Sequence, residues 1–293
     1  MSGICKDRVV IITGAGGGLG RAYALAFAAE GASVVVNDIN EAAAQATVAT
    51  IEANGGRAVV DHSDITNYND SLNAVRTALD NFGGLHVVVN NAGICRDRMF
   101  ASMTEEDWDA VIAVHLKGHF CITSHAVHYW RGQAKEGNAV DARIINTSSG
   151  AGLNGSIGQS NYVAAKGGIA ALTLNQAAEL ARYGITANAL APSARTGMTE
   201  EVFAEMMKKP EDGGFDAFDP ANIAPLVVWL GSPGSSGVTG RVFEAEGGKI
   251  SIADGWRSTD PVDKGARWEP AEVGSAVDEL LGRCVPPQKV YGT

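Results

Sequence analysis

The fold is decided by residues 8–21, which read RVVIITGAGGGLGR. The continuous apolar run at 9–12 predicts a strand whose two faces are both covered by helices. The glycines that follow form a turn, and Arg21 opens a helix. Backbone N–H groups of such a loop can approach a pyrophosphate, which is favoured at the positive end of a helix dipole. A plain flexible turn is the alternative, because the spacing is T-G-x-x-x-G-x-G, with Leu19 where the pattern G-x-G-x-x-G has its last glycine.

The same alternation of strand and helix continues along the chain. Further β-branched runs stand at 33–38, 57–62, 86–91, 143–148, 185–191 and 241–246, with stretches of helical character between most of them. Repeated strand–helix units predict an α/β fold with right-handed connections and a doubly wound parallel sheet. We expect one catalytic domain over residues 1–250, in which 193–219 is a substrate lid, and a C-terminal extension over 251–293.

Composition and charge exclude several classes of function. The 293 residues carry a net charge of −10, and no cluster of Lys and Arg offers a footprint for nucleic acid. Apolar runs stay below the ~18 residues of a membrane span, and the N-terminus leads straight into a strand with no room for a signal peptide. Four cysteines without a CxxC pair indicate a reduced protein, and the six histidines lack metal-ligand spacing. We therefore expect a cytoplasmic protein without a metal site.

Polar residues at the ends of predicted strands indicate a dinucleotide site. Asp38 ends the second strand, where a carboxylate accepts hydrogen bonds from the adenosine ribose and repels a 2′-phosphate, so NAD is expected rather than NADP. Capping of the next helix is the alternative role for Asp38. Asp64 can bond the adenine amino group, with Ile65 packing nearby, or can simply form a turn. Three residues after the fourth strand are expected to line the same cleft: Asn91, Ala92 and Gly93.

A candidate proton-transfer group begins the helix after the fifth strand. Tyr162 and Lys166 are four residues apart and share one helix face, and Ser149 follows the fifth strand. Tyrosine is a poor base because its unperturbed pKa is about 10. A neighbouring ammonium, together with the positive charge of an oxidised nicotinamide, would lower that pKa, and the serine hydroxyl can hold the substrate oxygen. These residues are the expected catalytic set.

Taken in order, the motifs resemble those of the short-chain dehydrogenase/reductase family over residues 5–250. TGAGGGLG resembles the family's cofactor loop, NNAG its fourth-strand motif, and Ser149, Tyr162 and Lys166 its catalytic triad. The resemblance implies a Rossmann-like seven-stranded sheet, a homodimer or homotetramer, and hydride transfer at C4 of the nicotinamide. It also implies that Lys166 bonds the nicotinamide ribose. The loop residues that it assigns to the cofactor are Gly14, Gly18, Leu19 and Gly20.

Three positions depart from the family pattern. His115 stands where the family commonly has an asparagine that supports a water-mediated proton relay, so it either completes the relay or is a packing residue. The usual Pro-Gly after the sixth strand is replaced by Pro192 and Ser193, and the stretch after it is one residue short. Pro192 and Thr196 are nevertheless expected at the nicotinamide end of the cleft.

The departures strengthen a narrower resemblance. GAGGGLGRAYALAFA, VVVND and DWDAVIAVHLKG resemble the (3R)-hydroxyacyl-CoA dehydrogenases of peroxisomal multifunctional enzyme type 2 and its bacterial relatives. This implies a 3-hydroxyacyl-CoA as the small-molecule substrate, with CoA phosphates meeting Arg195, Lys208 and Lys209 unless these cations are merely solvated. The alternatives are a hydroxysteroid dehydrogenase, a 3-oxoacyl-thioester reductase, and a non-catalytic protein that senses NAD.

Overall fold

The computed structural model describes residues 3–197, 207–210, 213–253, 255–285 and 288–292. One sheet runs through the molecule in the strand order β3-β2-β1-β4-β5-β6-β7-β8. The strands are β1 (Val9–Thr13), β2 (Ser33–Asn37), β3 (Arg57–Asp61), β4 (Val87–Asn90), β5 (Ala142–Thr147), β6 (Ile185–Ser193), β7 (Val242–Glu246) and β8 (Lys249–Ala253). Strands β1 to β7 are parallel, which confirms the doubly wound α/β fold.

Within the described ranges the sheet has eight strands, one more than expected, because β8 pairs antiparallel with β7. Gly247 and Gly248 connect the two strands, and Gly247 adopts a left-handed conformation with φ 54°. A two-residue glycine turn is a hairpin signal, and the last predicted strand ended at residue 246, directly before this turn. β8 therefore begins just before residue 250, where the C-terminal extension was expected to start.

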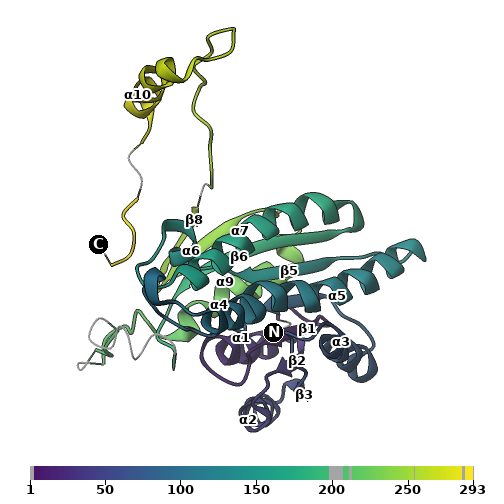
Figure 1. The fold of residues 1–293 in the computed structure, drawn as a ribbon. Helices are drawn as coiled ribbons and strands as arrows, with labels where there is room; N and C mark the ends of the chain where they lie inside the picture. The colour runs from purple at the N-terminus through teal and green to yellow at the C-terminus, as the bar shows by residue number, and fades with distance from the viewer. Residues whose placement is uncertain (1–2, 198–206, 211–212, 254, 286–287, 293) are drawn as a thin grey trace.

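Helices cover both faces of the sheet (Figure 1). One face packs on α1 (Gly18–Ala29), α2 (Glu41–Ala53) and α9 (Ala224–Gly231). The other packs on α3 (Tyr68–Phe82), α5 (Gly118–Lys135) and α7 (Ser160–Leu180). Alternate residues of β1 serve the two layers, with Val10 and Ile12 on the first and Val9 and Ile11 on the second. Burial on both sides explains the continuous apolar runs of these strands.

Shorter elements lie near the carboxyl ends of the strands. They are the 3₁₀ turn Phe100–Ser102, α4 (Glu105–Ile112), the π-helical turn Ala113–Lys117, α6 (Gly150–Asn154) and the 3₁₀ turn Pro220–Asn222. After β8 the chain carries α10 (Val273–Arg283) away from the sheet before it returns (Figure 1). Among the described residues, none of the helices is long and apolar enough to cross a bilayer.

The strand order places a site at one edge of the sheet. β1 lies between β2 and β4. From β1 the chain first adds β2 and β3 on one side, and it then returns to add β4 and the later strands on the other side. In open α/β sheets the crevice at such a switch point, beyond the carboxyl ends of the strands, is where ligands bind. The register puts Thr13 level with Asn37, and Asn90 level with Asn146, so polar side chains gather at that edge.

Candidate active site

A cleft of about 510 Å³ opens at the carboxyl ends of β1 and β4. It brings together residues that are far apart in the sequence, from the glycine loop to the start of α7. The residues expected at the site that line it are Gly14, Gly18, Leu19, Asp38, Asp64, Ile65, Asn91, Ala92, Gly93, His115, Tyr162, Lys166, Pro192 and Thr196. Gly20 lies behind the loop, and Ser149 reaches the site through a hydrogen bond to Tyr162.

The glycine loop has the geometry of an anion site. Gly14 and Gly18 adopt left-handed conformations with φ of 63° and 50°, which glycine tolerates at little cost. A Cβ at Gly20 would lie 2.1 Å from the carbonyl oxygen of Gly14, so the loop and the first turn of α1 touch backbone to backbone. α1 starts at Gly18, and its N-cap Gly17 provides no side-chain cap. The first N–H groups of α1 are therefore open to a ligand's phosphates.

Asp38 is held by the loop rather than by the next helix. Its Oδ2 accepts from the backbone N–H of Gly16 at 2.9 Å, and its Oδ1 accepts from that of Asn40 at 2.9 Å. The side chain of Asn40 caps α2 by accepting from the N–H of Ala43 at 3.1 Å. The alternative role of Asp38 as helix cap is thus taken by Asn40. Asp38 presents a half-buried carboxylate to the cleft, with lone pairs left for ribose hydroxyls.

Asp64 forms the turn that was its alternative role. Its Oδ1 accepts from the backbone N–H and from the hydroxyl of Thr66, both at 2.8 Å. Asp64 still lines the cleft, next to the buried Ile65. The turn therefore fixes the position of the carboxylate, and a contact with adenine stays a prediction.

Thr13 is a site residue that the sequence reading missed. Its hydroxyl accepts from the N–H groups of Asn91 at 2.9 Å and Ala92 at 3.0 Å. The amide of Asn91 in turn donates to the carbonyl of Thr13 at 2.9 Å. These bonds tie the ends of β1 and β4 together. The position of Thr13 directly before Gly14 was the available signal for this role.

The catalytic set assembles around the first turn of α7. Tyr162 lies in that turn, and Ser149 caps α6 by accepting from the N–H of Ala151 at 3.2 Å and bonds the tyrosine side chain. Lys166 follows one turn later, and its Nζ donates to the carbonyl of Thr147 at 2.6 Å. The same Nζ lies 5.5 Å from the centroid of the Tyr162 ring. The predicted serine, tyrosine and lysine are thus brought together at one end of the cleft.

Burial determines the protonation of this pair. It raises the pKa of Tyr162 to about 12, against a smaller lowering by the hydrogen bond with Ser149, while the acidic groups of Cys95 and Asp97 raise it further. Burial likewise lowers the pKa of Lys166 to about 7. Lowering of the tyrosine pKa by the ammonium together with the positive charge of an oxidised nicotinamide stays a prediction. Desolvation penalises the charged forms of both residues and is the largest cause of each shift.

His115 packs against Tyr162 and is not protonated. It lies in the π-helical turn before α5, and its ring meets that of Tyr162 edge-on, with centroids 5.1 Å apart. Its Nε2 lies 2.7 Å from the carbonyl oxygen of Ile94, and burial lowers its pKa to about 3. Its Nδ1 is buried with no hydrogen-bond partner among the described residues. The packing role is therefore present, and Nδ1 is the atom left for the predicted relay.

The His115 ring leaves no room for a side chain at position 93. A Cβ at this position would lie 2.4 Å from Cε1 of the His115 ring and 3.1 Å from its Nδ1. Gly93, the last residue of NNAG, is therefore in direct contact with the His115 ring beside the cleft. No sequence pattern links the two residues, because 22 positions separate them in the chain.

The segment expected as a lid is only partly within the described residues. Of 193–219, residues 198–206 and 211–212 lie outside them. Arg195 forms an ion pair with Asp216 and donates to the carbonyl of Met207, which closes the segment onto itself. Asp216 thus balances the charge of the Arg195 guanidinium, and a contact of Arg195 with CoA phosphates stays a prediction.

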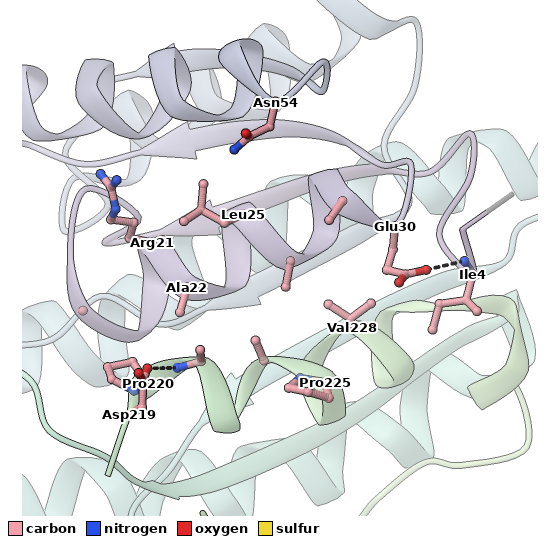
Figure 2. A pocket seen from close by; sticks show the side chains of 15 residues that line it. Ile4, Arg21, Ala22, Leu25, Glu30, Asn54, Asp219, Pro220, Pro225 and Val228 are labelled. Atoms are coloured by element: carbon pink, nitrogen blue, oxygen red, sulfur yellow. Dashed lines mark hydrogen bonds between the residues drawn. The ribbon is translucent and has the colours of Figure 1, made fainter. Parts of the chain in front are cut away.

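A second hollow of about 840 Å³ lies on the other side of α1, between that helix and α9 (Figure 2). Apolar residues such as Leu25 and Val228 dominate its walls. Among the described residues, Gly18 alone is common to this hollow and the cleft, and none of the expected catalytic residues lines the hollow. The larger hollow is therefore separate from the catalytic groups.

Comparison with known proteins identifies the family. The family described as short chain dehydrogenase matches residues 8–207. The chain belongs to the short-chain dehydrogenase family. It is accordingly an oxidoreductase, and the predicted resemblance is confirmed.

Individual relatives lie within the same family. The chain is 42% identical over 300 residues to hydroxyacyl-CoA dehydrogenase ChsB1 of Mycobacterium tuberculosis, covering 98% of this chain and 93% of that protein. It is 43% identical over 258 residues to peroxisomal multifunctional enzyme type 2 of Mus musculus, covering 85% of this chain and 32% of that protein. The crystal structure of a short chain dehydrogenase from Mycobacterium avium is 56% identical and matches with a TM-score of 0.91 over 99% of this chain and 100% of that one.

Proposed function

We propose that this short-chain dehydrogenase uses NAD to interconvert the 3-hydroxyl of a 3-hydroxyacyl-CoA and the corresponding ketone. The observation that carries the proposal is the assembly of Ser149, Tyr162 and Lys166 at one end of a cleft whose other end presents Asp38. The similarity to a hydroxyacyl-CoA dehydrogenase over nearly the whole of both chains supports the choice of substrate.

The fit of a dinucleotide rests on the loop and on Asp38. The uncapped N–H groups at the start of α1 would hold the pyrophosphate. Both oxygens of Asp38 are fixed by backbone N–H groups, so the carboxylate is oriented for ribose hydroxyls and repels a 2′-phosphate. A side chain at Gly16 would fill this space, since its Cβ would lie 2.8 Å from Asp38 Oδ2. These features support NAD over NADP.

The protein's residues handle the proton and the oxygen. Bound NAD supplies the nicotinamide carbon that accepts the hydride from the alcohol carbon, or returns it in the reverse direction. Tyr162 takes the hydroxyl proton as that carbon–hydrogen bond breaks, and its deprotonated form must be reached from a pKa that burial has raised. Ser149 holds the substrate oxygen beside the tyrosine. Lys166 lies above the ring and contributes positive charge when it is protonated.

The decisive experiment combines turnover with binding. NADH formation is followed with a 3-hydroxyacyl-CoA, the free 3-hydroxy acid, a hydroxysteroid and a simple secondary alcohol. The CoA ester is expected to be the best substrate, and preference for the steroid would replace the substrate assignment by its rival. Tyr162→Phe should lower kcat by ~10²–10⁴ because a positioned acid–base group is lost. NAD affinity, measured by calorimetry, should stay unchanged in this variant. A protein that only senses NAD would bind NAD but show no turnover even as the wild type.

Subunit organisation and location complete the proposal. Exposed apolar side chains on two helices, Phe120 on α5 and Leu174 on α7, support a homodimer or homotetramer built on helix faces. We also propose a cytoplasmic location and a catalytic domain that includes β8 and so ends a few residues after the expected boundary at 250, with the C-terminal extension following it. Light scattering after size-exclusion chromatography tests the first of these statements.

A further inference from the structure

The chain returns to the catalytic site near its C-terminal end. After α10 has been carried away from the sheet, residues 288–292, here named the return segment, come back to the loop between α6 and α7 (Figure 1). Tyr291 makes two backbone hydrogen bonds there. Its N–H donates to the carbonyl of Gly155 at 3.1 Å, and its carbonyl accepts from the N–H of Ile157 at 3.0 Å. The return segment is thus attached to the loop that joins Ser149 to Tyr162.

The side chain of Tyr291 lies against the residue next to the catalytic serine. A Cβ on Gly150 would lie 2.6 Å from the Tyr291 hydroxyl and 3.2 Å from its ring. Val290 covers Gly155 in the same way, at 3.3 Å from a Cβ on that residue. The glycines of the catalytic loop therefore make room for the return segment. Tyr291 itself remains 51% exposed.

A second segment borders the same loop. The N–H of Arg98 donates to the carbonyl of Gly158 at 2.8 Å, and the amide of Gln159 donates to Asp97 at 2.9 Å. Arg98 is followed by Met99 and by Phe100, whose side chain is 77% exposed. Four apolar or aromatic side chains thus stay exposed on segments that are hydrogen-bonded around one loop: Met99, Phe100, Ile157 and Tyr291. We refer to these four as the apolar collar.

The position of the collar favours the acyl group of the substrate as its occupant. Exposed apolar side chains that gather in one region generally mark a binding surface. Tyr291 packs against Gly150, the residue after Ser149, and Ser149 would hold the substrate oxygen at C3. The acyl group that carries C3 is therefore the apolar part of the substrate available to the collar. We propose that the collar binds the apolar acyl group of the substrate, and that Tyr291 is a residue that determines specificity for long or bulky acyl groups. The inference rests on the proposed function, because it requires an acyl substrate at Ser149.

The test compares long and short acyl groups. kcat/KM is measured for 3-hydroxyhexadecanoyl-CoA and 3-hydroxybutyryl-CoA with the wild type, Tyr291→Ala and Tyr291→Phe. Tyr291→Ala is expected to lower the ratio of long to short substrate about tenfold or more, since an apolar contact of one or a few carbon atoms already changes specificity by ~10-fold. Tyr291→Phe should keep the ratio, because it retains the ring. Trp256→Ala is the matched control, since Trp256 is an aromatic side chain, 99% exposed, between β8 and α10.

A binding measurement separates this inference from the reaction. Calorimetry with the saturated thioesters hexadecanoyl-CoA and butyryl-CoA requires no turnover, and Tyr291→Ala should weaken only the first. An unchanged ratio and unchanged binding in an active Tyr291→Ala enzyme overturn the collar while the proposed function stands. A wild type that turns over neither ester overturns both. A change of subunit number in Tyr291→Ala by light scattering, with the ratio unchanged, would instead make the collar a contact with a second copy.

Discussion

Substitution of Gly93 by alanine tests whether His115 is a rigid part of the site. The new Cβ would lie 2.4 Å from Cε1 of a buried ring, about 1 Å closer than the contact distance of ~3.5 Å between carbon atoms. Overpacking of a core costs about 1–3 kcal/mol. Movement of the ring also weakens the 2.7 Å contact between Nε2 and the carbonyl of Ile94, which adds about 1 kcal/mol. We expect Gly93→Ala to lower the free energy of unfolding by about 2–4 kcal/mol.

The assay is a double-mutant cycle by urea denaturation. His115→Asn removes Cε1, so Gly93→Ala in that background should cost less than about 1 kcal/mol, leaving a coupling energy of about 2 kcal/mol. Gly132→Ala is the matched control, because Gly132 lies within α5 and a Cβ there meets nothing within 4 Å. Helix propensity predicts that this control stabilises the protein by about 0.5–1 kcal/mol. Equal costs of Gly93→Ala in the two backgrounds would refute the reasoning.

Two further predictions concern the cofactor and the buried lysine. Asp38→Ala combined with Ile39→Arg should shift the ratio of kcat/KM for NAD over NADP about tenfold or more toward NADP, because a charge-assisted hydrogen bond to the phosphate is worth about 1.5–3 kcal/mol; a wild type that already prefers NADP contradicts the role given to Asp38. Burial lowers the pKa of Lys166 to about 7, so the unfolded chain binds more protons than the folded one from pH 7 upward, and the lysine's contribution makes stability rise with pH. Lys166→Met should remove up to about 1.4 kcal/mol per pH unit of that rise between pH 7 and 9 in denaturation experiments, and identical pH dependence in both proteins would show that Lys166 titrates normally.

The sequence determined the fold and the positions of the catalytic groups. The seven parallel strands are readable as β-branched runs, and central strands such as β1 read as continuous apolar runs because helices cover both faces of the sheet. Tyr162 and Lys166 are four residues apart on one helix, and this local spacing alone puts them on one face. The glycine loop is equally local, since its left-handed turns depend on the residues of the loop itself.

Only the tertiary structure decided how these groups act on one another. The pKa values of Tyr162 and Lys166 depend on how completely the folded chain removes them from water, which their spacing does not express. The contact of Gly93 with His115 and the attachment of Tyr291 beside Ser149 join residues that are distant in the chain. No periodic pattern marks such contacts, because they arise from the packing of separate elements and not from the geometry of any one of them.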